Sequence, residues 1–149
     1  MPDEPLFNFH SEHDTFTLKD EQLISNWLQS IVTKEQKEVS QINYVFVSDE
    51  ALLKLNKEYL DHHDFTDILS FQLEENPIEG DIFISIDRVK ENAESYKVSF
   101  DNELLRVIAH GLLHFIGYKD KTDQEKMEMR KKEEECLLMI STSLNHRDS

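Results

Sequence analysis

The sequence predicts a single α+β domain, spanning residues 1–149, in which helices pack on one mixed sheet of about four strands. The length of 149 residues suits one compact domain with a sizeable core. Hydrophobic residues make up 38% of the chain, which is enough to fold despite its high charge. Helical and strand-like patterns follow one another with no repeat, linker or low-complexity tract between them.

The first part of the chain shows two helical patterns and one strand pattern. Residues 23–32 place apolar side chains at helical spacing after an acidic start, which indicates an amphipathic helix. Residues 42–46 alternate between apolar and polar side chains, as a half-buried strand does. Residues 49–60 then return to the helical pattern.

The middle of the chain predicts a β-hairpin and a short helix. Two apolar runs at 67–73 and 81–86 bracket residues 74–80, which include asparagine, proline and glycine as turn formers. Residues 87–96 follow as a shorter helix. Strands and helices in this order favour a sheet with helices packed on it.

Charge and cysteine content limit the classes of function. The formal net charge of −15 argues against binding of nucleic acid or anionic membrane through the overall field, so any polyanionic substrate must be gripped locally. Cys136 is the only cysteine, which excludes an intramolecular disulfide. Residues 1–12 lack the pattern of a signal peptide, and no segment is apolar enough to span a bilayer. We therefore expect a cytoplasmic protein with no membrane partner.

The strongest functional signal lies in residues 101–120, DNELLRVIAHGLLHFIGYKD. This segment is apolar on almost every side, which predicts a buried helix with Asp101 as N-cap and Gly117 as the residue that ends it. Four polar residues interrupt the apolar surface at spacings of three, four and four, so they form one stripe: Glu103, Arg106, His110 and His114. A polar stripe on a buried helix must face a cleft.

His110, His114 and Asp120 are the candidate metal ligands. Two imidazoles four residues apart on one helical face can bind one ion, and the glycine turn lets Asp120 complete the set. Three such ligands leave an open coordination position, as in catalytic zinc sites. Two imidazoles favour zinc, whereas the carboxylate shifts the preference toward manganese, iron or magnesium. The structural alternative is that both histidines are hydrogen-bonded core residues.

The spacing H-x-x-x-H-x-x-G-x-x-D parallels that of metzincin proteases in geometry. Those enzymes carry a glutamate base directly after the first histidine, where this chain has Gly111. A metalloprotease is therefore a weaker hypothesis than another metal-dependent hydrolase, in which a bound ion acidifies water without a protein base.

These residues resemble the YbeY family of endoribonucleases, which mature ribosomal RNA. The family hallmark HGxLHLxGYDH stands here as HGLLHFIGYKD at 110–120. Three further family blocks occur in the expected order: LNKEY at 55–59, TDILSF at 66–71 and GDIFIS at 80–85.

The resemblance extends downstream to Glu133. Glu125, Met129 and Glu133 are spaced like the trailing E-x-x-x-M-x-x-x-E helix of the family, and Thr122 begins this helix as a capping box with Glu125. By themselves these residues indicate only a solvated amphipathic helix.

The chain departs from the family pattern at two places. The third metal histidine of the family aligns with Asp120, so the resemblance implies a ligand set of two histidines and one carboxylate, with Asp123 as the less favoured third ligand. The arginine that many members carry after the LNxxY block is replaced by Leu60. Arg106 is a candidate substitute because a guanidinium can grip a phosphate, although it can equally pair with Glu103.

Asp67 and Ser70 are candidate substrate-binding residues, because the resemblance puts their strand beside the metal helix. The structural alternatives are a turn cap for Asp67 and backbone hydrogen bonds for Ser70. His62 and His63 have no evident partners in the sequence, and we assign them no role.

The resemblance implies a single-strand-specific, metal-dependent endoribonuclease that acts in ribosomal RNA processing and ribosome biogenesis. One alternative is a metalloprotease-like hydrolase. Another is a ribosome assembly factor with a structural metal, since an acidic surface suits basic ribosomal proteins.

Overall fold

Four strands form one mixed sheet, and five helices pack around it, in the computed structural model, which describes residues 6–60 and 66–148. The elements, in chain order, are β1 (Phe7–Ser11), α1 (Glu21–Lys34), β2 (Val39–Val47), α2 (Asp49–Leu60), β3 (Ile68–Glu75), β4 (Ile78–Ser85), α3 (Ile86–Tyr96), α4 (Phe100–Ile116) and α5 (Asp123–Asp148). The strand order is β1-β2-β4-β3, in which only β3 is antiparallel to its neighbour. The predicted α+β class and mixed sheet are confirmed.

β1 was not located by the sequence pattern. It is short, and it pairs in parallel with β2, so that Phe7 lies opposite Ile42. Phe7 is buried, and the ring of Phe9 stacks on that of Tyr44 at 5.5 Å between centroids. Polar residues alternate with these two rings, so the segment acquires its strand character from the neighbouring strand.

The β3–β4 hairpin is confirmed, but its turn is shorter than residues 74–80. The strands pair up to Glu75 and Ile78, which leaves only two residues between them. Gly80 belongs to β4, where an added Cβ would lie 2.7 Å from the ring of Phe115. This glycine therefore permits close packing of α4 on the sheet and forms no part of the turn.

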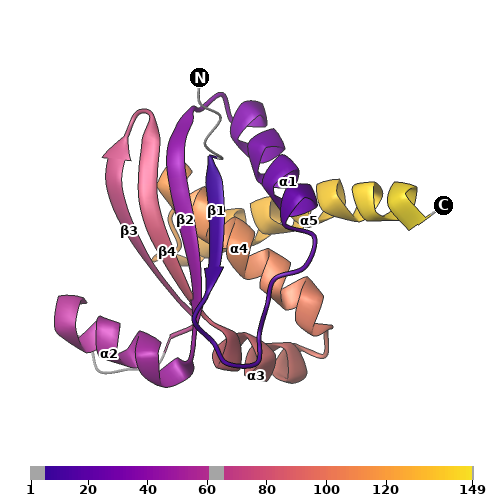
Figure 1. Cartoon of the computed structure of the whole chain (residues 1–149). Helices are drawn as coiled ribbons and strands as arrows, with labels where there is room; N and C mark the ends of the chain where they lie inside the picture. Colours follow the sequence, from indigo (N-terminus) through magenta and orange to yellow (C-terminus); the bar gives the residue numbers. More distant parts are fainter. Residues whose placement is uncertain (1–5, 61–65, 149) are drawn as a thin grey trace.

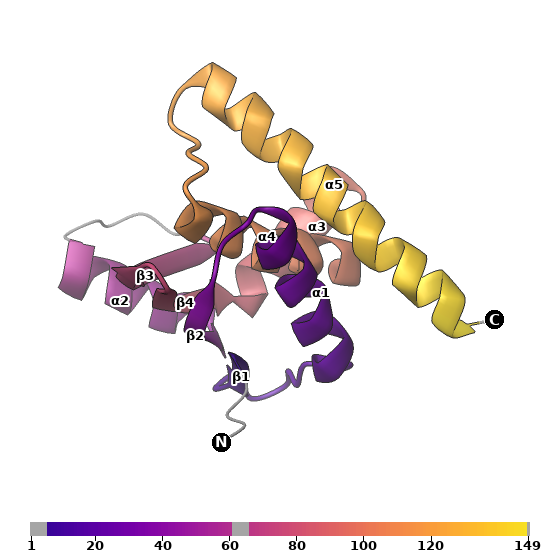
Figure 2. The ribbon, with the colours of Figure 1, turned by 90° about the horizontal axis from the view of Figure 1, so that it is seen from above.

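The core lies between one face of the sheet and the helices α1 and α4, with α5 packed on these two helices from outside (Figures 1 and 2). Two buried hydrogen bonds cross these layers. The Tyr44 hydroxyl donates to the Ile108 carbonyl at 2.8 Å, and the Trp27 indole donates to the Cys136 carbonyl at 2.7 Å. They fix α4 to the sheet and α5 to α1, because a buried donor without a partner is costly.

The opposite face of the sheet carries α2, which buries Leu52 against Val47 and Leu69 (Figure 1). α2 therefore lies across the sheet from α4 and contributes nothing to the polar stripe. Within residues 6–60 and 66–148, no helix combines the length and apolar character needed to cross a membrane.

Candidate metal centre

α4 begins two residues earlier than the sequence predicts. The Ser99 hydroxyl accepts a hydrogen bond from the Asn102 amide at 3.0 Å, so Ser99 is the N-cap and the prediction of Asp101 is wrong. Ser99 has the extended backbone of an N-cap, whereas Asp101 lies exposed in the first turn. Its negative charge there still complements the positive end of the helix dipole.

The end of α4 returns the chain toward the polar stripe. Gly117 adopts φ 128°, a conformation that side-chain-bearing residues rarely tolerate, so its predicted role is confirmed. The amides of Gly117 and Tyr118 donate to the Leu113 carbonyl at 3.1 and 3.0 Å. The next helix starts with the expected capping box, in which Thr122 and Glu125 exchange hydrogen bonds of 3.0 and 3.1 Å. Asp120 lies on the short connection between these two ends.

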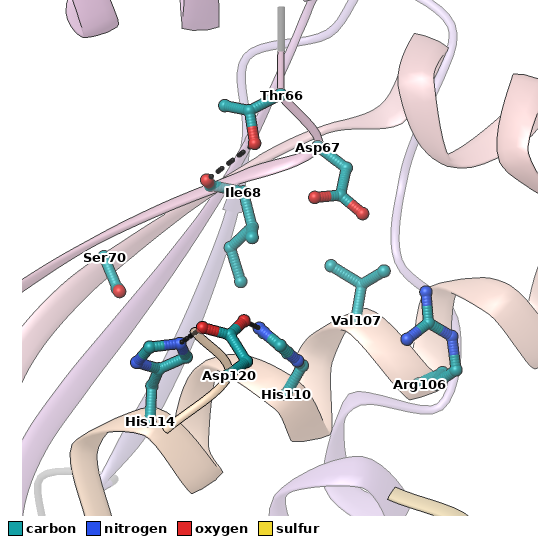
Figure 3. Close-up of a pocket in the computed structure, with 9 residues that line it drawn as sticks. All are labelled: Thr66, Asp67, Ile68, Ser70, Arg106, Val107, His110, His114 and Asp120. Atoms are coloured by element: carbon teal, nitrogen blue, oxygen red, sulfur yellow. Dashed lines mark hydrogen bonds and ion pairs between the residues drawn. The ribbon is translucent and has the colours of Figure 1, made fainter. Parts of the chain in front are cut away.

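His110, His114 and Asp120 come together at one side of the cleft, as Figure 3 shows. The Nε2 atom of each histidine lies 3.3 Å from a different carboxylate oxygen of Asp120. The three ligand atoms lie within 4.8 Å of one another. Donors bound about 2.0–2.1 Å from a tetrahedral zinc stand roughly 3.3–3.4 Å apart. The group therefore fits one divalent ion, and Asp123 is not part of it.

Behind His110, the less exposed of the two histidines, lies a buried network of two carboxylates and one arginine, in which Glu133 contacts the ring. Glu133 of α5 and Glu103 of α4 have side chains that are 2% exposed, and Arg106 lies between them. Arg106 donates to Glu133 Oε1 at 2.8 Å and binds both oxygens of Glu103. The second oxygen of Glu133 lies 2.6 Å from Nδ1 of His110.

The charges of this network shift two pKa values in opposite directions. Burial alone would lower the pKa of His110, but the hydrogen bond and charge of Glu133 raise it above its usual range. Burial alone would raise the pKa of Glu133, but His110 and Arg106 hold it below its usual range. Both pKa shifts have the same cause, which is the pairing of the ionised Glu133 carboxylate with His110.

The opposite wall of the cleft comes from the start of β3 and the residues before it (Figure 3). The cleft has a volume of about 320 Å³, and Asp67 and Ser70 both line it across from the metal ligands. Asn92 donates to the Asp67 carboxylate at 3.4 Å. Burial raises the pKa of Asp67, and the positive charges of His110 and Arg106 offset only part of that rise.

Arg106 also lines the cleft, but its guanidinium is engaged by two buried carboxylates. The pairing with Glu103, the structural alternative for this arginine, is therefore present. The Leu60 side chain and residues His62 and His63 lie outside the part of the chain whose side chains the structure describes.

Gly111 sits between the two histidines and faces the sheet. An added Cβ would lie 2.9 Å from Ile82 and 3.1 Å from Ile68. A methyl group here would require the side chains of Ile82 and Ile68 to shift, and a glutamate side chain would have to enter the apolar contact between α4 and the sheet. The position that carries the base in metzincin proteases faces the sheet here, and Gly111 does not line the cleft.

Glu133 is the site residue to which the sequence assigned no role of its own. The pattern of α5 contains a signal for it, because Glu133 shares one helical face with Met129, Cys136 and Ile140, all buried. A carboxylate on the apolar face of a helix needs a partner, and that partner is on α4. The family resemblance identified Glu133 only through its spacing from Glu125 and Met129.

Comparisons with known proteins give one consistent family match. A family model described as Endoribonuclease YbeY matches residues 7–141. Among the relatives that carry that name, one from Flavobacterium johnsoniae is 48% identical and covers 91% of this chain and 97% of its own. Another, from Christiangramia forsetii, is 50% identical and covers 89% of this chain and 93% of its own. The solution structure of a Thermotoga maritima protein matches with a TM-score of 0.67 and 28% identity, covering 95% of this chain and 93% of its own.

Proposed function

This chain belongs to the YbeY family of endoribonucleases, and from that premise we propose that it hydrolyses single-stranded RNA and takes part in ribosomal RNA maturation. The observation that carries the proposal is the group of His110, His114 and Asp120 at the wall of a polar cleft. This group supports metal-dependent hydrolysis in particular. Processing of ribosomal RNA implies a cytoplasmic location.

His110, His114 and Asp120 would hold one divalent ion, and the two imidazoles favour zinc. Such an ion, when bound, supplies Lewis acidity toward a phosphoryl oxygen and acidifies water near neutral pH. Asp120 would balance part of the charge of the ion. His114 and Asp120 have side chains 38% and 34% exposed, and this access to solvent favours a catalytic over a purely structural metal.

The opposite wall offers groups that suit RNA. The Asp67 carboxylate and the Ser70 hydroxyl line the cleft facing the ligands. A carboxylate repels phosphate but accepts a hydrogen bond from a ribose 2′-hydroxyl, the group that distinguishes RNA from DNA. We therefore propose that Asp67 and Ser70 contact the sugar next to the scissile phosphate. Local contacts of this kind compensate for a net charge of −15 that disfavours nucleic acid at long range.

RNA cleavage by the zinc-loaded protein tests this function. The wild type should cut a single-stranded RNA oligomer and leave the DNA oligomer of the same sequence intact, and His114→Ala should not cut either. His10→Ala is the matched control, because the side chain of His10 is 70% exposed and lies outside the cleft. RNA left intact by the wild type with bound metal, or equal cleavage by His114→Ala, contradicts the proposal.

Two further measurements separate the alternatives. Elemental analysis of the purified wild type and of Asp120→Ala identifies the metal and tests the third ligand, because loss of the carboxylate should reduce the bound metal. Incubation with an unstructured protein tests for protease activity, which the packing around Gly111 disfavours. Proteolysis that His114→Ala abolishes would replace the RNA substrate by a protein one.

A further inference from the structure

Glu133 is a buried carboxylate far along the chain from the metal ligands. It lies about three turns into α5, and its side chain points away from solvent toward α4. Its side chain is only 2% exposed. A charge in such a place is costly unless each of its oxygens is paired, so its partners explain its presence.

Both oxygens of Glu133 are committed, each to a different donor. Oε2 lies 2.6 Å from Nδ1 of His110, and Oε1 accepts from Nη1 of Arg106 at 2.8 Å. Arg130 approaches the same Oε1 at 3.9 Å from the solvent side. The remaining donors of Arg106 bind Glu103, so the guanidinium is held from both sides and in turn holds Glu133.

We propose that Glu133 is a positioning residue for the metal centre, which accepts the Nδ1 proton of His110 and so directs the Nε2 atom of that ring toward the ion. The inference rests on the proposed function, because it assigns His110 as a ligand. A neutral imidazole carries one proton, and a carboxylate that binds Nδ1–H leaves Nε2 free to coordinate. Nε2 of His110 indeed faces Asp120, at 3.3 Å from Oδ2. Carboxylate–histidine pairs of this kind fix ring orientation and strengthen the ligand.

Electrostatics adds to the effect of orientation. The negative charge of Glu133 lies on the Nδ1 side of His110, opposite the Nε2 atom that faces Asp120. A negative charge behind a ligand stabilises a cation in front of it. A role limited to holding α5 on α4 would need the Arg106 contact but not the contact to His110.

Glu133→Gln is the decisive variant. The amide has one acceptor and one donor group, so it cannot accept from both His110 and Arg106, although its size is unchanged. Zinc affinity of the metal-free protein is measured by competition with a chromophoric chelator, and its melting temperature by circular dichroism. We expect zinc affinity to fall by about 10–100-fold.

Glu103→Gln is the matched control. Glu103 is equally buried and binds the same arginine, but it makes no contact with His110 among the interactions of the described residues. Both variants should lower the melting temperature of the metal-free protein, whereas Glu103→Gln should keep a zinc affinity close to that of the wild type. Unchanged affinity in Glu133→Gln, or an equal loss in both variants, overturns the inference.

A second measurement needs no variant and therefore does not depend on whether Glu133→Gln folds. Nitrogen-15 NMR of the zinc-loaded wild type reports which ring nitrogen of His110 carries the proton. We expect a slowly exchanging proton on Nδ1, and a proton on Nε2 would overturn the inference. A wild type that binds no divalent ion contradicts the proposed function itself, whereas normal zinc binding with the opposite tautomer contradicts only the role of Glu133.

Discussion

His110 and His114 occupy the same face of one helix, one turn apart, yet their surroundings differ. Each places Nε2 at 3.3 Å from an oxygen of Asp120. The side chain of His110 is 16% exposed and is backed by the ion-paired Glu133, whereas that of His114 is 38% exposed. Among the described residues, no hydrogen bond is formed by Nδ1 of His114. The centre therefore has a rigid inner side and an open outer side.

The difference assigns separate tasks to the two sides. On the inner side, contacts between α4 and α5 fix the ring of His110 before any ion is bound. On the outer side, His114 and Asp120 border the cleft and remain accessible to a substrate. A catalytic metal centre needs ligands that are held in place before the ion binds, and it also needs an open side that the substrate can reach.

The largest expected effect comes from removing the cation of the inner side. Arg106→Met leaves Glu103 and Glu133 buried without their shared partner, and loss of one partner from a buried ionic group typically costs about 3–5 kcal/mol. We expect the free energy of unfolding of the metal-free protein, from urea denaturation, to fall by that amount. Lys131→Met, at an exposed position of α5, is the control.

The loss of unfolding free energy in Arg106→Met should also depend on pH. The pKa of Glu133 is below its usual value, so its stabilising effect is complete above the ordinary pKa of a glutamate and is lost as the pH falls through the lowered value. The difference between wild type and variant should therefore narrow in acid. A difference that stays constant down to the acid limit of folding would exclude ionic pairing as its source.

Metal removal should affect the two sides unequally. A ligand at 100 times its Kd adds about 2.7 kcal/mol to stability, so chelation should lower the melting temperature without unfolding the protein. The ring of His110 should stay ordered, while His114 and residues 117–122 should gain mobility by NMR relaxation. Cooperative unfolding on chelation, reversed by added zinc, would instead identify the metal as structural.

The two histidines should differ in stability once the metal is absent. His110→Ala removes the partner of a buried carboxylate oxygen, which costs about 1–3 kcal/mol. His114→Ala removes a half-exposed ring and should leave the metal-free protein close to wild type. Urea denaturation of both variants in excess chelator makes this test. Equal losses would show that the inner network does not hold His110.

The smallest expected effect concerns the connection that carries Asp120. The Tyr118 hydroxyl donates to Glu35 at 2.8 Å, and Lys132 binds the other oxygen of Glu35 at 3.3 Å. Tyr118→Phe loses one partly buried hydrogen bond, worth about 0.5–1.5 kcal/mol, and should weaken zinc binding only slightly. Tyr96→Phe is the control, because Tyr96 is 54% exposed on α3.

Local patterns predicted α4 and its functional face correctly. The spacing of Glu103, Arg106, His110 and His114 is enough to align them, because helical geometry depends on neighbours in sequence. The glycine stop and the Thr122 capping box are equally local and were also predicted. The cap at Ser99 and the two-residue hairpin turn were missed, since several neighbouring residues had the right chemistry for each role.

Sequence alone determined which residues share the polar face of α4, where that helix ends, and that a carboxylate follows within reach of two histidines. Tertiary structure decided which residues contact these histidines from α5 and which residues form the opposite wall of the cleft. Glu133 meets His110 across 23 residues of sequence, and β1 is a strand because β2 lies beside it. Periodicity carries no information about such partners, because contacts between elements depend on how the chain packs and not on the spacing within one helix or strand.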